Sequence, residues 1–289
     1  MELHVIDTGF FKLDGGAMFG VVPKTLWSKA HPPDEKNLCT WAMRCLLVVD
    51  GDRRILIDNG LGDKQDSKFF SHYEPHGDAT LDSSLRTAGF HRDDITDVFL
   101  THLHFDHCGG SIRWNSARDG FEPAFRNATY WSNEHHWKWA TTPNAREKAS
   151  FLKENILPIQ ESGQLRFVDI GRRSAEENLF IPEVFPGFGV LLVNGHTDAM
   201  MIPFIEHKGR TLIYMADLLP SVHHIPLPWV MGYDTRPLLT LQEKRDVLEL
   251  AARKEHVLFF EHDATNQCCT VQETEKGVRL KETFPLSAV

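Results

Sequence analysis

The sequence predicts an α/β protein whose sheets are covered by helices on their outer faces. Short apolar runs alternate with turn residues along the chain, which is typical of strands joined by tight turns. Segments with a helical apolar stripe lie between groups of these strands. The composition suits a globular core, since 42% of the 289 residues are hydrophobic and 25% are charged. A layered α/β fold is therefore favoured over a simple βαβ repeat.

Apolar runs bounded by turn residues mark the expected strands. Asp50-Gly51 lies between two such runs and is a strong hairpin signal, and Lys208-Gly209 gives another hairpin turn. The expected strands are Leu3–Ile6, Cys45–Val49, Arg54–Ile57, Val98–Thr101, Gly189–Val193, Met201–Glu206, Thr211–Met215 and Val257–Phe260.

Capping residues and apolar spacing mark the expected helices. A helix over Asp82–Ala88 is followed by Gly89, a residue that favours the C-cap. Further helices are expected to begin at Asn144 and Thr240, because each is followed three positions later by a glutamate, the spacing of a capping box. The first of these carries an apolar stripe to Ile156, and the second runs to about Glu255 with Leu241, Leu248, Ala251 and Ala252 facing the core.

The charge and cysteine patterns exclude several classes of protein. The formal net charge is −9 and no Lys/Arg-rich run occurs, so nucleic acid is not an expected partner. No apolar stretch approaches the roughly 20 residues of a membrane span, and Met1–Gly16 lacks the pattern of a signal peptide. The five cysteines include no CxxC pair, which indicates reduced thiols. We therefore expect a cytoplasmic protein with no membrane partner.

The segment from Thr101 to Gly110 carries the strongest chemical signal. It follows a buried apolar run and contains His102, His104, Asp106 and His107 in an HxHxDH pattern. The first two histidines point to the same side if the strand end is extended. Imidazole and carboxylate groups suit zinc and related divalent metals, and burying so many titratable groups without a metal would be costly. The segment predicts a metal site.

Three later segments repeat the same order of an apolar run followed by a residue that can bind metal. His196 follows Leu191–Val193, Asp217 follows Leu212–Met215, and His262 follows Val257–Phe260. Strand ends at one sheet edge converge in space, so these side chains are expected to join the metal site. Adjacent His135 and His136 could mark a further site, but neighbouring residues on a helix diverge, which favours packing.

From about Leu46 to Asp263 the chain resembles the metallo-β-lactamase superfamily, for which HxHxDH is a specific motif. The resemblance implies an αββα sandwich, with two mixed sheets and helices on the outer faces, and a single domain over residues 1–289. It also implies two divalent metal ions, with Zn²⁺ expected. One ion would be held by His102, His104 and His196, the other by Asp106, His107 and His262, and Asp217 would bridge them.

Other segments resemble one group of enzymes within the superfamily. Residues 7–16 and the following Met18-Phe19-Gly20 resemble N-acyl homoserine lactonases, which quench quorum sensing. Residues 216–224 resemble a broader group of hydrolases that includes both lactonases and phosphotriesterases. The pattern with a bridging aspartate resembles that of lactonases, methyl-parathion-hydrolase-like enzymes and glyoxalase-II-like hydrolases. The expected function is a hydrolase that opens lactones, and a homodimer is a possible assembly. The alternatives are a phosphotriesterase, another carboxylic-ester hydrolase, or a non-enzymatic metal-binding module, which the intact ligand set disfavours.

The resemblance also gives roles to residues outside the ligand set. Asp106 would move the proton to the leaving alkoxide in addition to binding metal. Some lactonases have a tyrosine where this chain has Pro220, which offers no N–H or hydroxyl donor. His224 is therefore expected to donate to the oxyanion, with His223 in reserve. The candidate substrate-binding residues are Met18, Phe19, Trp27 and Phe70, which could equally be packing residues.

Overall fold

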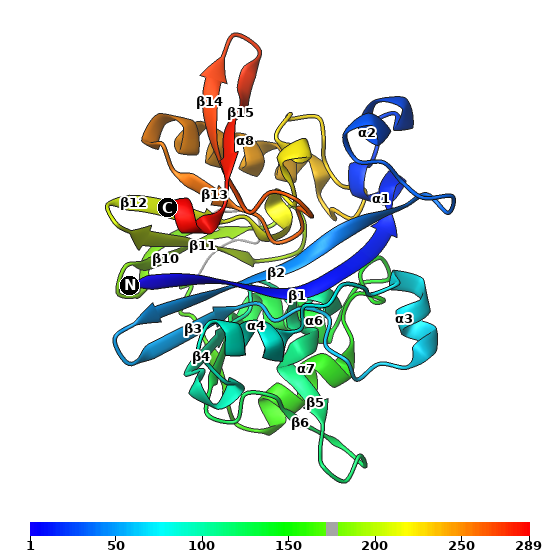
Figure 1. Ribbon diagram of the computed structural model, residues 1–289, viewed down its shortest axis with the longest axis vertical. Coiled ribbons are helices and arrows are strands. Elements are labelled where there is room, and N and C mark those ends of the chain that lie inside the picture. Colours follow the sequence, from blue (N-terminus) through cyan, green and yellow to red (C-terminus); the bar gives the residue numbers. More distant parts are fainter. Residues whose placement is uncertain (172–178) are drawn as a thin grey trace. The chain divides into compact units, whose positions relative to one another are not determined.

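The computed structural model describes residues 1–171 and 179–289, and the chain divides into two compact units (Figure 1). Unit 1 comprises Met1–Gly9 and Met43–Arg172, and unit 2 comprises Phe10–Ala42 and Arg173–Val289. Each unit is built on one large β-sheet. The expectation of a single domain over the whole chain stays a prediction.

Unit 1 is built on a mixed sheet of strand order β1-β2-β3-β4-β7-β8. The pairing of β2 with β3 is antiparallel, whereas β3, β4, β7 and β8 run parallel to one another. The predicted hairpin at Asp50-Gly51 is confirmed, because Asp50 pairs with Arg53 and Gly51 has a φ of 57°. The strands are β1 (Glu2–Asp14), β2 (Leu38–Asp50), β3 (Arg53–Ile57), β4 (Asp97–Phe99), β7 (Thr129–Ser132) and β8 (Leu165–Phe167), and a separate ribbon pairs β5 (Ile112–Trp114) with β6 (Phe121–Pro123).

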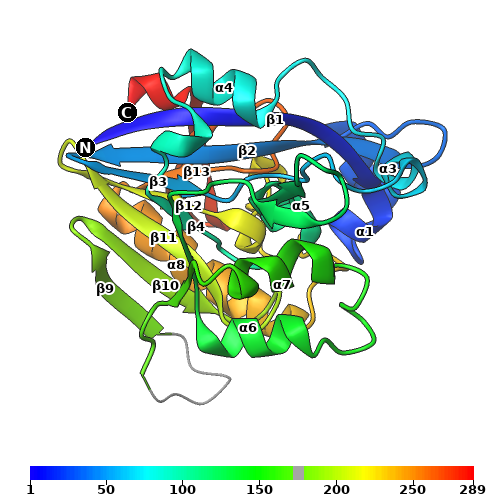
Figure 2. The ribbon, with the colours of Figure 1, turned by 90° about the horizontal axis from the view of Figure 1, so that it is seen from below.

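Alternate residues of the unit 1 strands form one side of its core. Leu47, Leu56, Val98 and Tyr130 lie in one apolar cluster with residues of the helices, because successive side chains of a strand point to opposite faces. Figure 2 shows two of these helices, α6 and α7, in green. The helical segments of unit 1 are α3 (Ser67–Tyr73), α4 (Leu81–Thr87), η1 (Arg92–Asp94), α5 (Phe105–Cys108), η2 (Gly109–Ser111), α6 (Glu134–Thr141) and α7 (Lys153–Glu161).

The structure confirms the helix predicted at 82–88 and corrects the one predicted from Asn144. Asn144 does accept hydrogen bonds from the backbone N–H groups of Arg146 and Glu147, as in a cap. The chain then forms only turns, and α7 begins at Lys153. The buried carboxylate of Glu147 accepts from Trp139 Nε1 and from the Asn144 amide, so it is held toward the protein interior and not along a helix surface.

Unit 2 is built on a second mixed sheet, of strand order β15-β14-β13-β12-β11-β10-β9. Neighbouring strands are antiparallel except for the parallel pair β12 and β13. His207 pairs with Arg210 around Lys208-Gly209, which confirms the second predicted hairpin. The strands are β9 (Leu179–Phe185), β10 (Phe188–Val193), β11 (Met200–His207), β12 (Arg210–Tyr214), β13 (Val257–Phe259), β14 (Cys268–Thr274) and β15 (Gly277–Phe284).

The long helix α8 (Pro237–Lys254) contacts β14 and β15, and Figure 1 shows it in orange beside this red hairpin. It begins three residues before the predicted start at Thr240, because Pro237 occupies its first turn, where proline is favoured. Its end near Glu255 is confirmed. The shorter helical segments of unit 2 are α1 (Gly15–Phe19), α2 (Lys24–Ala30), η3 (Ala216–Leu218), η4 (Val222–His224) and η5 (Leu286–Ala288).

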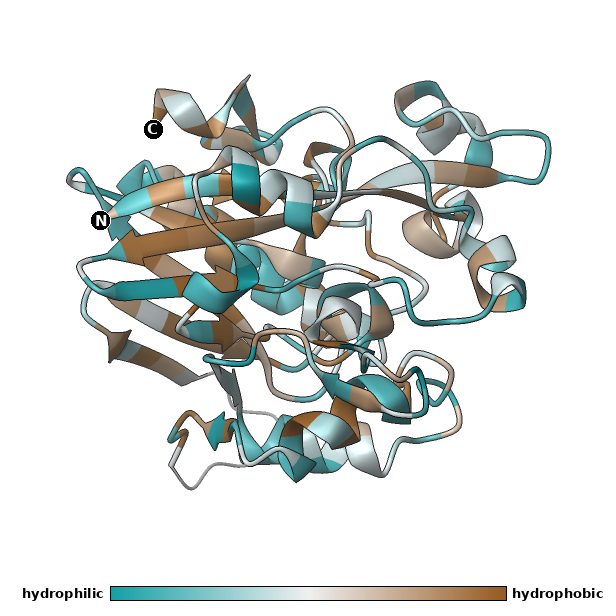
Figure 3. Ribbon diagram, turned by 60° about the horizontal axis from the view of Figure 1, so that its bottom comes forward, coloured by the Kyte–Doolittle hydropathy of each residue, from teal (hydrophilic) through white to brown (hydrophobic). Residues whose placement is uncertain are grey.

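Figure 3 shows hydrophobic residues along the strands and hydrophilic residues in many of the connecting turns, as the sequence pattern predicts. All five cysteines are buried and free. Among the described residues, no helix is both long enough and apolar enough to cross a membrane.

Candidate functional site

The HxHxDH residues of unit 1 form a compact group, which we call the first ligand set: His102, His104, Asp106 and His107. β4 ends at Phe99, so the two leading histidines lie in the loop after the strand, and the one-turn helix α5 carries the other two residues. His102 Nε2 lies 3.1 Å from His104 Nδ1, and His107 Nε2 lies 3.9 Å from Asp106 Oδ2. All these side chains are buried. The segment therefore gathers its nitrogen and oxygen atoms in one place, as predicted.

Asp58, at the end of β3, orients the first ligand set. Its carboxylate accepts from the backbone N–H and the hydroxyl of Thr101, and it lies 3.0 Å from His107 Nδ1. Because a carboxylate accepts, this contact places the His107 proton on Nδ1, so that Nε2 is the ring nitrogen with the lone pair that a metal ion needs. On the other side, His136 Nε2 accepts from the Leu103 backbone N–H. His136 thus supports the loop, whereas His135 is exposed, which agrees with the divergence expected of neighbours on a helix.

The residues predicted after the later strands form the second ligand set, which lies in unit 2: His196, Asp217 and His262. They follow β10, β12 and β13 respectively. Asp217 lies between the two histidines, with Oδ2 3.1 Å from His196 Nε2 and Oδ1 3.0 Å from His262 Nε2. The two oxygens of a single carboxylate therefore face two different imidazoles, as a bridging ligand requires.

Each histidine of the second ligand set is held through its other ring nitrogen. His196 Nδ1 lies 2.9 Å from Asp234 Oδ1, and His262 Nδ1 lies 2.8 Å from the carbonyl oxygen of Ala42. Burial alone would lower the pKa of His196, but the carboxylates of Asp217 and Asp234 raise it to about 10. The two carboxylates therefore favour a positive charge on the His196 ring.

The donor atoms of both sets fit divalent metal ions of the zinc type. Imidazole nitrogens and carboxylate oxygens are the ligands such ions take, and their orientation by Asp58 and Asp234 is the usual arrangement around metal-binding histidines. The atoms of His102 and His104 that could bind metal lie within 4.8 Å of one another, and so do those of His196 and Asp217. The chemistry of the residues present therefore agrees with the predicted cofactor.

His224 does not lie as its predicted role requires. Its ring is 1% exposed and stacks on Phe19, with ring centroids 4.7 Å apart. Nδ1 lies 2.8 Å from Ser221 Oγ, and Nε2 lies 2.9 Å from the carbonyl oxygen of Met18. Burial lowers the pKa of His224 to about 3, so the ring is neutral. With both nitrogens engaged inside unit 2, the ring has no N–H left to offer an oxyanion, whereas His223 on the same turn is half-buried.

The predicted substrate-binding residues divide between the two units. Met18, Phe19 and Trp27 are fully buried in unit 2, where Phe19 stacks on Trp27 as well as on His224. They form an aromatic cluster, so in this structure they act as packing residues. Phe70 lies half-buried on α3 of unit 1. The structure therefore does not bring the four together within one unit.

Sequence reasoning missed the buried charged residues that hold the ligand loops. Asp58 could have been found, because it follows the apolar run of β3 in the same order as the other acidic candidates. Glu147, whose Oε1 lies 3.5 Å from His104 Nε2, was interpreted only as a helix cap. Asp234 carried no signal, because its partner His196 is distant in the sequence. Glu243 was interpreted only as a capping-box residue, and Lys244 was not singled out.

Comparisons with known proteins agree on the family. The family model of the Metallo-beta-lactamase superfamily matches residues 44–262. An N-acyl homoserine lactonase from Bacillus cereus is 23% identical over 266 residues, covering 88% of this chain and 89% of that protein. The N-acyl homoserine lactonase AiiA of Bacillus thuringiensis subsp. kurstaki is 24% identical over 240 residues, covering 78% and 82%.

Solved structures share the fold. A probable metal-dependent hydrolase from Staphylococcus aureus superposes with a TM-score of 0.84 at 26% identity, covering 98% of both chains. AidC, a dizinc quorum-quenching lactonase, superposes with a TM-score of 0.74 at 23% identity, covering 98% of this chain and 95% of its own. These likenesses confirm the predicted fold class.

Proposed function

The chain belongs to the metallo-beta-lactamase superfamily of metal-dependent hydrolases, and from this premise we propose that it is a dinuclear zinc enzyme that opens lactone rings. N-acyl homoserine lactones are the proposed substrates, which would make the protein a quorum-quenching enzyme. The curated relatives named above support this choice of substrate, since both are N-acyl homoserine lactonases.

In this proposal the two ligand sets together hold two divalent ions. The position of Asp217 in unit 2 is the observation that carries it, because each of its oxygens faces the Nε2 atom of a different histidine. The Nδ1 atoms of His196 and His262 already have acceptors, so both rings present Nε2 as the ligand atom. A structural cluster of buried histidines would not need this shared carboxylate.

Two bound divalent ions would supply Lewis acidity toward the lactone carbonyl and a nucleophile from water at neutral pH. The residues of the chain would orient the substrate and move protons. Asp106, buried beside His107, is the group proposed to carry a proton from the attacking water to the alkoxide oxygen that leaves. His223 takes over the role of oxyanion donor, because its ring is half-buried whereas both nitrogens of His224 are engaged.

Metal content and substrate preference test this proposal. Elemental analysis of the purified chain should find close to two zinc ions per chain. Proton release should be followed on homoserine lactones, simple lactones, a paraoxon-type triester and a cephalosporin. Lactones should react faster than the cephalosporin by orders of magnitude.

Variants of two histidines provide the matched control. His196→Ala should lose lactone hydrolysis, because it removes a ligand of the second set. His135→Ala should keep it, because His135 is an exposed residue of α6. Equal turnover of the cephalosporin and the lactones, or full activity with one ion per chain, would contradict the proposal.

A further inference from the structure

Helix α8 buries two neighbouring charged side chains, Glu243 and Lys244, each of which is 1% exposed. A buried charge is costly unless hydrogen bonds compensate for the lost water. Neither residue forms part of a ligand set. The hydrogen-bond partners of Glu243 and Lys244 therefore indicate what each side chain does.

The carboxylate of Glu243 binds the backbone immediately before His196. It accepts from the N–H of Asn194 at 2.7 Å and from the N–H of Gly195 at 3.0 Å. Each oxygen of the carboxylate takes one backbone donor, so both N–H groups are paired. The loop that leaves β10 is thus fixed at the two peptide groups that precede its metal-binding histidine.

The start of α8 holds the carbonyl side of the same peptide groups. The Arg236 backbone N–H donates to the Gly195 carbonyl at 2.8 Å, and Arg236 Nη1 donates to the Asn194 carbonyl at 2.7 Å. A Cβ atom on Gly195 would lie only 2.4 Å from the backbone nitrogen of Thr240. The loop therefore lies directly against the helix, with no side chain between them.

Lys244 binds a different loop, because neighbouring residues on a helix point about 100° apart. Its ammonium group donates to the carbonyl oxygens of His224 at 2.9 Å, Pro226 at 3.1 Å and Trp229 at 2.8 Å. These acceptors lie seven or more residues after Asp217. The two buried charges of α8 thus fix two separate loops, and only the loop held by Glu243 leads directly into a proposed metal ligand.

We propose that Glu243 is a positioning residue for His196. By fixing the peptide groups of Asn194 and Gly195, it places the His196 ring where Nε2 meets Asp217 and Nδ1 meets Asp234. This inference rests on the proposed metal-binding function. It adds a residue of α8, 47 positions from His196 in the sequence, to the groups that set metal affinity.

Glu243→Gln is the sharpest variant, because it keeps the size of the side chain. A glutamine offers one carbonyl oxygen and one NH₂ group, so it cannot accept from both backbone N–H groups, and its NH₂ group would face one of them. The loop must then shift to relieve this contact. Changes around metal-binding residues typically weaken affinity by about 10–100-fold, and we expect a change of this size.

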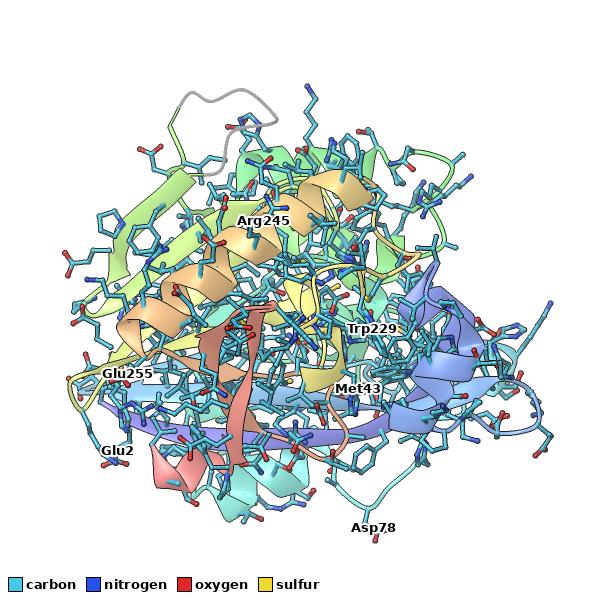
Figure 4. All side chains as sticks on the ribbon, turned by 90° about the horizontal axis from the view of Figure 1, so that it is seen from above. Glu2, Met43, Asp78, Trp229, Arg245 and Glu255 are labelled. Atoms are coloured by element: carbon cyan, nitrogen blue, oxygen red, sulfur yellow. The ribbon has the colours of Figure 1, made fainter. Side chains whose placement is uncertain are left out.

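The test measures Zn²⁺ affinity of the full-length chain by competition with a coloured chelator, together with urea unfolding of the metal-free chain. Asp246→Asn is the surface control, because it makes the same chemical change at an exposed position of α8. Lys244→Met is the buried control, because it removes a buried charge without touching the His196 loop. Figure 4 labels Arg245, which lies between Lys244 and Asp246 on α8, and Glu255, which follows the end of the helix.

The expected result is weaker Zn²⁺ binding by Glu243→Gln, with affinities within about threefold of wild type for the two controls. A Glu243→Gln affinity equal to wild type would overturn the inference, and so would an equal loss in Lys244→Met, which would indicate general destabilisation. If Glu243→Gln does not fold, Arg236→Lys tests the same loop, because it removes the contact with the Asn194 carbonyl. A wild-type chain that binds no Zn²⁺ would instead overturn the proposed function itself.

Discussion

Protonation of His224 should destabilise the folded chain in mildly acidic solution. The carbonyl oxygen of Met18 only accepts hydrogen bonds, so Nε2 of the neutral ring carries the proton and Nδ1 accepts from the Ser221 hydroxyl. A second proton on Nδ1 would require the hydroxyl to turn and would place a charge in the aromatic cluster. Lys244 also lies near enough to repel that charge.

The size of the effect follows from the shift in pKa. Burial lowers the pKa of His224 from 6.5 to about 3. Because the folded-state pKa lies below the unfolded value, only the unfolded chain binds this proton between these limits. The stability contributed by the neutral ring is complete above about pH 6.5 and is lost as the pH falls toward 3. Each pH unit corresponds to about 1.4 kcal/mol, so a fall to about pH 4.5 should cost about 2.7 kcal/mol.

Urea unfolding of the metal-free chain at about pH 7.5 and about pH 4.5 measures this loss. His224→Gln serves as the variant that cannot titrate. Glutamine is chosen because its amide can still donate to the Met18 carbonyl. All other titrating groups are shared, so the wild type should lose about 2.7 kcal/mol more than this variant. His223→Gln removes a histidine from the same turn and should lose as much as the wild type. Equal losses in wild type and His224→Gln would refute the reasoning.

Two further predictions concern the second ligand set and its loop. Asp217→Asn should lower bound metal more than His104→Ala, because Asp217 faces two histidines and would touch both ions; elemental analysis decides this, and equal losses would count against a bridging role. Gly195→Ala should destabilise the chain by about 1–3 kcal/mol in urea unfolding, because its Cβ would lie 2.4 Å from the Thr240 nitrogen. Gly120→Ala, where the Cβ meets only the end of a side chain at 3.3 Å, should change stability by less than about 0.5 kcal/mol.

The strands that were predicted carry local signals, whereas β7, β8, β14 and β15 were not predicted. Apolar runs and hairpin dipeptides determine β3, β11 and β12 within a few residues, whereas β1 and β2 each extend well beyond one predicted end. The helix predicted from Asn144 shows where local signals fail. Its cap forms, but burial of the Glu147 carboxylate against Trp139 replaces the helix with turns. A tertiary contact of this kind overrides local propensity and leaves no trace in the spacing of residues.

The candidate site divides in the same way. The first ligand set was predictable because its members lie within a few positions of one another, and the second because each member follows an apolar run. The role of His224 was not, because the sequence does not show that its loop folds inward onto Phe19. A loop histidine near a metal ligand suits both a donor and a packing residue until its two hydrogen-bond partners are known.

The charged pair of α8 could have been recognised as unusual from the helix pattern alone. Residues four apart share one side of a helix, so Glu243 is in line with Val247 and Ala251, and Lys244 is in line with Leu248. All five side chains are buried. A charge in register with an apolar stripe must either break the stripe or find buried partners, and here the partners are backbone groups of two loops. Charges at such positions of an amphipathic helix are therefore candidates for positioning residues, although the sequence alone does not identify the loop that each one holds.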